Sequence, residues 1–174
     1  MSGDSSSRHA SALTHIDRTG AARMVDVGEK PATRREATAA GSIRMSRDAF
    51  NAIRNNTIAK GDVLAVARIA GIMAAKRTAE LIPLCHAIAL SSVTVVLTPD
   101  ESLPGVRVEA TAVTVGPTGV EMEAIIAVSV ALATIYDMAK SADRAMVIGE
   151  IMLLRKSGGR SGDYTATGTE PPPV

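Results

Sequence analysis

The most distinctive hydrophobic pattern in the chain covers residues 124–136, which contain no charged side chain. If these residues form a helix, apolar side chains point from it in every direction, so it has no face suited to water. The helix is predicted over residues 119–140, with Thr118 as its N-cap and Glu121 completing a capping box. We expect one side of this helix to lie on a sheet and the other side to meet a second subunit.

The other hydrophobic patterns predict strands and shorter helices around this long helix. Alternating or β-branched segments predict strands, and apolar residues recurring every three or four positions predict helices. Ser46 and Asp62 are the expected N-caps of the two shorter helices. In chain order the predicted elements are strand 34–45, helix 48–54, helix 63–77, strand 88–98, strand 106–115, the long helix and strand 145–155. This order is the β-α-β-β-α-β pattern of a ferredoxin-like α+β sandwich with one additional helix.

The length of 174 residues fits a single domain. We expect the catalytic domain to cover residues 13–164, between a disordered extension of residues 1–12 and a disordered tail of residues 165–174. The uncharged runs are shorter than the roughly 20 residues that cross a bilayer, so no membrane association is expected. The single cysteine excludes an internal disulfide and is compatible with a reducing compartment, so the expected location is the cytoplasm.

The balance of charges argues against a nucleic-acid partner. Lys and Arg number 19 against 18 Asp and Glu, whereas binding to a phosphate backbone needs an excess of positive charge. The chain has one Phe, two Tyr and no Trp, so it has few side chains on which bases can stack. No Cys and His pair has the spacing of a zinc site, and no metal site is predicted.

Charged residues at the end of the long helix are candidates for chemistry. Asp137 and Lys140 are three residues apart and share a helix face. One interpretation is an exposed ion pair, which contributes little to stability. The other is catalysis, because a lysine beside apolar surface can lose pKa and exchange protons. Lys60 precedes a helix N-terminus and can add a donor to an anion site, although an ordinary surface lysine is the simpler interpretation.

Other polar residues leave two interpretations open. Glu123 has no capping role, and it is either a solvated acid favoured by the helix dipole or a functional group. His86 and Cys85 lie in a loop, where a lone histidine or cysteine is more often structural than functional. Lys156 belongs to a basic, glycine-rich segment that can wrap a phosphate or serve as a solvated linker.

The distance along the long helix makes a further prediction. Glu123 and Asp137 are fourteen residues apart, which corresponds to about 21 Å along a helix. That separation is too large for both side chains to touch one reacting centre within a single subunit. If both serve the same small substrate, the site must join the start of one helix to the end of a neighbour's helix.

A set of short motifs resembles the cyclic pyranopterin monophosphate synthase family, the C protein family of molybdenum cofactor biosynthesis. Each motif is weak alone, but together and in this order they are highly specific. They are LTHID (13–17), MVDV (24–27), KGD (60–62), ARIAGI (67–72), AKRT (75–78), LIPLCH (81–86), TGVEMEA (118–124), IYDM (135–138) and KSGG (156–159). One departure is that Ala87 follows His86, where the family commonly has proline, which is expected to loosen the backbone there.

The resemblance implies a ferredoxin-like fold, a homo-hexamer built as a trimer of dimers, and sites between subunits. It implies conversion of 3′,8-cyclo-7,8-dihydro-GTP to cyclic pyranopterin monophosphate with release of pyrophosphate. It also implies functions for individual residues: catalysis by Asp137, Lys140 and Lys60, and substrate binding by Leu84, Cys85, His86, Met122 and Glu123, with Glu121, Arg35 and Lys156 around the pocket. No cofactor is required by the sequence, although Mg²⁺ is compatible with a triphosphate substrate.

Overall fold

The computed structural model describes residues 21–160 and 162–167. In these residues the elements are β1 (Thr33–Arg44), α1 (Arg47–Arg54), α2 (Val63–Lys76), α3 (Thr78–Leu81), β2 (Leu90–Asp100), β3 (Gly105–Gly116), α4 (Glu121–Ala139), β4 (Val147–Ser157) and β5 (Tyr164–Thr165). The strands form one sheet in the order β2-β3-β1-β4-β5, and all neighbouring strands are antiparallel. The first four strands and the two long helices make the predicted ferredoxin-like α+β arrangement.

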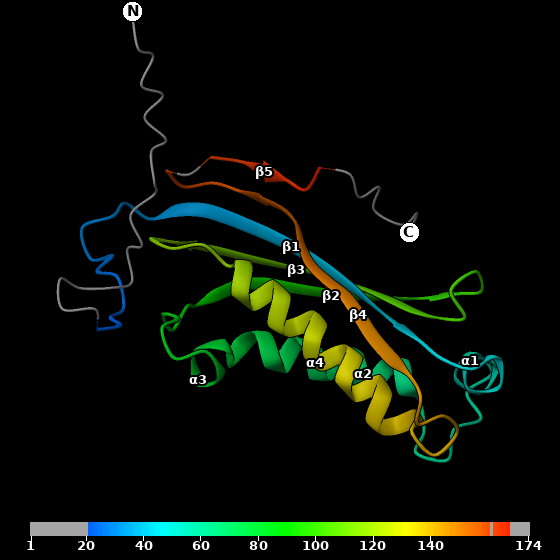
Figure 1. Ribbon diagram of the computed structural model, residues 1–174. Coiled ribbons are helices and arrows are strands. Elements are labelled where there is room, and N and C mark those ends of the chain that lie inside the picture. The colour runs from blue at the N-terminus through cyan, green and yellow to red at the C-terminus, as the bar shows by residue number, and fades with distance from the viewer. Residues whose placement is uncertain (1–20, 161, 168–174) are drawn as a thin grey trace, which may run out of the picture.

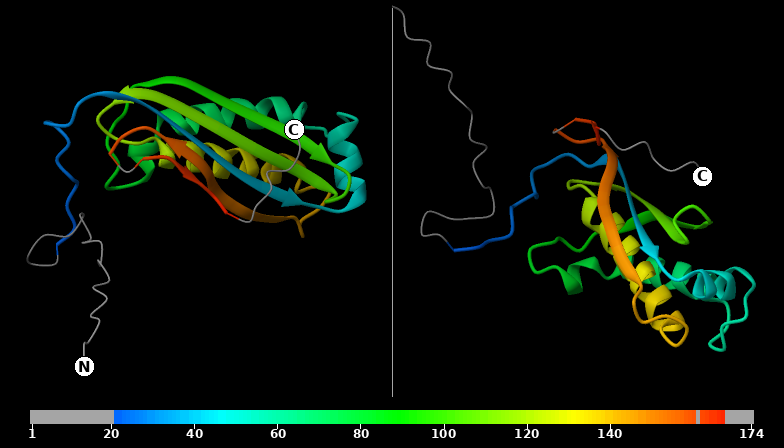
Figure 2. Two further views of the ribbon diagram at one scale, coloured as in Figure 1. Left: turned by 90° about the horizontal axis from the view of Figure 1, so that it is seen from above. Right: turned by 45° about the vertical axis from the view of Figure 1, so that its right-hand side comes forward.

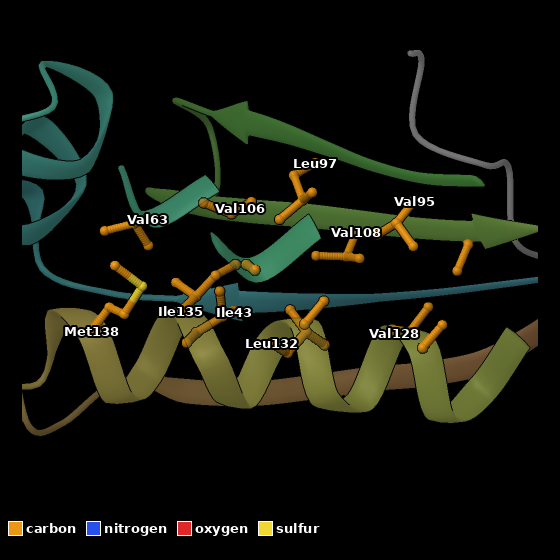
Figure 3. Packing of buried hydrophobic residues seen from close by; sticks show 14 of the residues in the cluster. Ile43, Val63, Val95, Leu97, Val106, Val108, Val128, Leu132, Ile135 and Met138 are labelled. Atoms are coloured by element: carbon orange, nitrogen blue, oxygen red, sulfur yellow. The ribbon is translucent and has the colours of Figure 1, made fainter. Parts of the chain in front are cut away.

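The molecule has two layers, with the sheet on one side and α2 and α4 on the other (Figures 1 and 2). The long helix α4 contacts β1, β3 and β4, and α2 contacts β2 and α4. Val128, Leu132 and Ile135 of α4 are fully buried and point toward the strands (Figure 3). Burial of these apolar side chains is the main source of stability for such a layer.

Glycines allow α4 to approach its neighbours closely. A Cβ atom at Gly41 of β1 would lie 2.9 Å from Val128 and 3.0 Å from Leu132. A Cβ atom at Gly71 of α2 would lie 2.9 Å from the carbonyl oxygen of Ala127. All three distances are shorter than normal packing contacts, so a larger residue at either position would push α4 away from the sheet or from α2.

The helix starts agree with the sequence at two positions and disagree at one. Ser46 and Asp62 are the N-caps of α1 and α2, as predicted, and each accepts a hydrogen bond from a backbone amide three residues later. The capping box predicted for the long helix is wrong, because α4 has Val120 as its N-cap without a side-chain bond. The carboxylate of Glu121 instead lies over Gly119, which has no side chain to exclude it.

The structure adds two small elements that the sequence patterns did not predict. Helix α3 has four residues, which is too short for a hydrophobic period to be visible. Strand β5 has two residues and pairs with Arg155 and Lys156 of β4. The 1–12 extension and residues 168–174 lie outside the described part of the chain.

The covering of α4 comes partly from the same chain. Helix α2 packs beside α4 and supplies much of the second cover that the sequence pattern required. Ile126 and Val130 of α4 remain half-buried, and Ala133 is exposed. By length and hydropathy α4 is apolar enough to cross a membrane, but half of it is buried inside the molecule, as in the core helix of a soluble protein.

Candidate functional site

A pocket of about 310 Å³ lies where α4 begins. Three segments that are far apart in the sequence form its walls: the chain before β1, the loop after α3, and the turn leading into α4. Figure 1 shows these three segments at the same end of the molecule. The lining residues are Val25, Val27, Lys30, Leu84, Cys85, His86, Ile88, Thr118, Gly119, Glu121, Met122 and Glu123. The pocket therefore unites six of the eight predicted substrate-binding residues.

Glu123 is the most buried acid of the pocket, with 3% of its surface exposed. The interpretation of Glu123 as a solvated first-turn acid is therefore wrong. Burial raises the pKa of Glu123, and the negative charge of Glu121 adds to the rise. Side chains two positions apart on a helix normally face different directions. Both acids nevertheless line this pocket, because it wraps around the first turn of α4. The site thus holds two acids, one of which is desolvated.

Cys85 is half-buried beside these acids. Burial raises the pKa of its thiol, and the charge of Glu123 raises it further. A thiol with a raised pKa is mostly protonated at neutral pH and is a poor nucleophile. Cys85 therefore serves the pocket as an apolar wall.

Arg35 and Lys156 do not line the pocket but contact segments that do. The Arg35 side chain donates hydrogen bonds to two backbone carbonyls, at 2.9 Å to Gly116 and 3.0 Å to Pro117. These carbonyls belong to the turn that leads into α4, so Arg35 fixes that turn. The Lys156 ammonium lies 3.4 Å from the Glu121 carboxylate and holds that acid at the pocket edge.

The chain before β1 contributes a wall that the sequence analysis did not assign to the site. We call residues 23–30 the N-terminal strap. Val25, Val27 and Lys30 of the strap line the pocket, and the backbone carbonyl of Val25 lies 2.8 Å from Nε2 of His86. No periodic pattern marks the strap, and the MVDV motif at residues 24–27 was the one signal that pointed to it.

The predicted catalytic residues meet at the opposite end of α4. Asp137 stands between two lysines: Lys60 Nζ is 3.0 Å from its carboxylate and 2.8 Å from its backbone carbonyl, and Lys140 Nζ is 2.8 Å from the other carboxylate oxygen. We call Lys60, Asp137 and Lys140 the charged trio. The trio confirms the predicted pairing of Asp137 with Lys140 and adds the lysine from the loop before α2.

The electrostatics of the trio differ from those predicted for a lysine on apolar surface. About half of each side chain is exposed, at 48% for Lys60, 60% for Asp137 and 52% for Lys140. The hydrogen bond from Lys140, followed by that from Lys60, lowers the pKa of Asp137 to about 2. The pKa of Lys140 is raised by its bond to Asp137, so the predicted loss of pKa is wrong for this chain. Asp137 and Lys140 are therefore both charged at neutral pH.

The pocket and the trio are separate within one chain. Helix α4 has 19 residues and is therefore about 28 Å long. No residue of the trio lines the pocket. In the described residues there is also no cluster of three or more His, Cys, Asp or Glu side chains that could hold a metal ion.

Comparison with known proteins identifies the family to which the chain belongs. The model of a family described as the MoaC family matches residues 24–159. The chain belongs to the MoaC family. The matched region of this MoaC-family chain includes every residue that lines the pocket and all three members of the trio.

Similar proteins agree with the family match. A protein from Brucella ovis is 57% identical over 155 residues, which cover 89% of this chain and 94% of that protein. A protein from Methylobacterium sp. (strain 4-46) is 60% identical over 154 residues, which cover 88% of this chain and 96% of that protein. Both are named cyclic pyranopterin monophosphate synthase. The similarity of the MoaC-family chain to these relatives therefore extends over nearly the full length of both partners.

Proposed function

We propose that this chain is a cyclic pyranopterin monophosphate synthase of molybdenum cofactor biosynthesis. It is a lyase that converts 3′,8-cyclo-7,8-dihydro-GTP to cyclic pyranopterin monophosphate and releases pyrophosphate. The observation that carries the proposal is 57–60% identity, over nearly the whole chain, to proteins of that name. The pocket and the charged trio, both inside the matched region, supply groups suited to the two parts of this substrate.

The pocket suits the guanine-derived ring of the substrate. Such a ring presents N–H donors, and carboxylates accept hydrogen bonds from them. Glu123 and Glu121 therefore face the ring, while Leu84, Met122 and Cys85 provide apolar contacts around it. The two acids would repel a phosphate group, so the triphosphate lies away from this end.

The trio suits the triphosphate and the leaving pyrophosphate. Lys60 and Lys140 are cations, and cations stabilise the charge that develops on a leaving phosphate group. A carboxylate with a pKa of about 2 is a weak base at neutral pH, so Asp137 orients the two lysines and does not itself remove a proton. Lys140 is protonated and can supply a proton during ring opening.

The size of the pocket supports a site shared between subunits. A volume of about 310 Å³ is at the lower end of the range for small-molecule sites, which is about 300–1,000 Å³. It can hold the ring and sugar, but the triphosphate must extend beyond it toward the cations of a trio that lies about 21 Å along α4 from Glu123. The protein therefore acts as a homo-hexamer, a trimer of dimers, in which one subunit's pocket faces a neighbour's trio. It works in the cytoplasm, and Mg²⁺ can accompany the triphosphate.

Turnover can be tested directly. The purified protein is incubated with the cyclised nucleotide, and pyrophosphate and the pterin product are measured with and without EDTA. Both products should appear at equal rates. Binding of the nucleotide without either product would contradict the proposal and indicate a nucleotide-binding module. Loss of turnover in EDTA, restored by Mg²⁺, would show that the metal takes part.

Mixing of inactive subunits tests the shared site. Asp137→Ala removes the trio of one subunit, and Glu123→Ala removes the pocket acid of another. When the two variants are dissociated and reassembled together, random pairing should restore about a quarter of the sites, because some sites receive both intact halves. Absence of any recovery, with assembly confirmed by light scattering, would show that each site lies within one chain.

A further inference from the structure

The bond between His86 and the N-terminal strap determines which of its ring nitrogens can face a ligand. Nε2 of His86 lies 2.8 Å from the carbonyl oxygen of Val25, 61 residues away in the sequence. A carbonyl oxygen only accepts hydrogen bonds, so Nε2 must carry the proton of this bond. The other nitrogen, Nδ1, is then the one ring atom left for a further polar contact.

The strap is the pocket wall that has the least support from regular structure. It precedes β1. Within it the Lys30 amide donates a hydrogen bond to the Val27 carbonyl, and the Gly28 amide donates one to the Asp26 carboxylate. These bonds shape the strap but do not attach it to the opposite wall. The bond from His86 does attach it, because His86 belongs to the loop after α3 that forms that wall.

We propose that His86 is a positioning residue that holds the N-terminal strap closed over the pocket through its Nε2–H bond to Val25. This inference rests on the proposed function, and it gives His86 a role in holding the strap in addition to its place in the pocket lining. When the bond is broken, the wall formed by Val25 and Val27 moves outward and the ammonium of Lys30 leaves the pocket.

Two substitutions separate this role from direct recognition of the substrate. In His86→Gln the amide nitrogen lies the same number of bonds from Cα as Nε2, so it can still donate to Val25. In His86→Asn the amide lies in place of Nδ1 and cannot reach Val25. The two variants remove the same ring and differ in which of its nitrogens they replace, so each serves as the control for the other.

The two variants are compared in the full-length assembled protein with two measurements. The first is the KM and kcat for the cyclised nucleotide. The second is the rate at which N-ethylmaleimide modifies Cys85, the single cysteine of the chain, which lines the same pocket. We expect His86→Gln to keep the Cys85 modification rate close to that of the wild type and to raise the KM less than His86→Asn does. We expect His86→Asn to raise the KM and the Cys85 modification rate about fivefold, the loss expected for one hydrogen bond, with a smaller change in kcat.

Three results would overturn the proposal: a functional His86→Asn beside an impaired His86→Gln, equal impairment of both variants, or wild-type behaviour of both. The first would show that Nδ1 contacts the substrate. The modification rate does not depend on catalysis, so it still decides on the strap if the wild-type protein fails to turn over the nucleotide. That failure would refute the proposed function alone.

Discussion

The two ends of α4 carry acidic groups in opposite physical states. At the start of the helix Glu123 is enclosed by the pocket, and burial raises its pKa. At the end of the helix Asp137 is exposed between two lysines, and their hydrogen bonds lower its pKa to about 2. Residues of a single chain line the pocket, whereas the side chains of the trio are about half exposed. The comparison indicates that burial sets the pKa of the acid at the first end and that ion pairing sets the pKa of the acid at the second. Substitutions at the two ends should therefore have different consequences.

The largest effect is expected from Asp137→Ala. Loss of the carboxylate leaves Lys60 and Lys140 without the group that holds them together, and we expect kcat to fall about a thousandfold. The exposed trio contributes little to folding, so the melting temperature should stay close to that of the wild type. Turnover assays and thermal denaturation measure the two quantities.

The matched control for this change is Glu80→Ala. Arg77 and Glu80 form an exposed ion pair with the same three-residue spacing, at 2.9 Å. Its removal should leave kcat unchanged. If Asp137→Ala kept its activity as Glu80→Ala does, the trio would be an ordinary set of surface ion pairs.

A smaller loss of activity, with a gain in stability, is expected from Glu123→Gln. The amide keeps one acceptor oxygen but replaces the other with an NH2 donor, which faces a ring that also presents donors, so turnover should fall about 10- to 100-fold. Because the pKa of Glu123 is raised in the folded protein, its contribution to stability is present below its usual value of about 4.5 and is lost as the pH rises through the folded pKa. Glutamine cannot ionise, so the variant should melt about 2–4 °C higher than the wild type at pH 8.

Thermal denaturation from pH 4 to pH 8 tests the predicted direction in which the stability contribution of Glu123 changes with pH. The difference in melting temperature should be small at pH 4 and should grow with pH. A difference that shrinks with pH would mean that Glu123 is stabilised as a carboxylate by a charge that the described residues do not supply.

A loss of binding without loss of turnover is expected from Arg35→Lys. Lysine has one ammonium group and cannot hold the carbonyls of Gly116 and Pro117 in the geometry of a guanidinium. The turn that carries Thr118 and Gly119 should loosen, and the KM should rise about tenfold. Arg34→Lys is the control, since Arg34 is an exposed neighbour paired with Glu36. Equal effects of the two substitutions would contradict this function of Arg35.

The smallest effect is expected from Ser46→Ala, far from the pocket. The Ser46 hydroxyl caps α1, and loss of an N-cap costs about 1 kcal/mol. Denaturant titration should show this decrease with unchanged KM and kcat. A change in activity would indicate that α1 is coupled to one end of α4.

The sequence was sufficient to predict the strands, the long helix and two helix caps, because these depend on local pattern. Ser46 and Asp62 are preferred cap residues followed by apolar periods, and local pattern is reliable for such segments. The burial of Glu123 could not be predicted, since it depends on the strap and on the loop after α3, which reach the helix from distant parts of the chain. Arg35 was assigned to the pocket by resemblance, and only the fold revealed that it binds the carbonyls of a turn.

The contact at Gly41 has a mechanical consequence for the two ends of α4. Because Gly41 has no side chain, Val128 and Leu132 pack directly against the backbone of β1 at that position. A helix packed this closely on a strand cannot slide or tilt without a steric clash. The packing of α4 on the sheet therefore fixes the distance between the Glu123 carboxyl and the ammonium groups of the trio. An alanine at Gly41 would shift α4 and would displace both ends of the helix together.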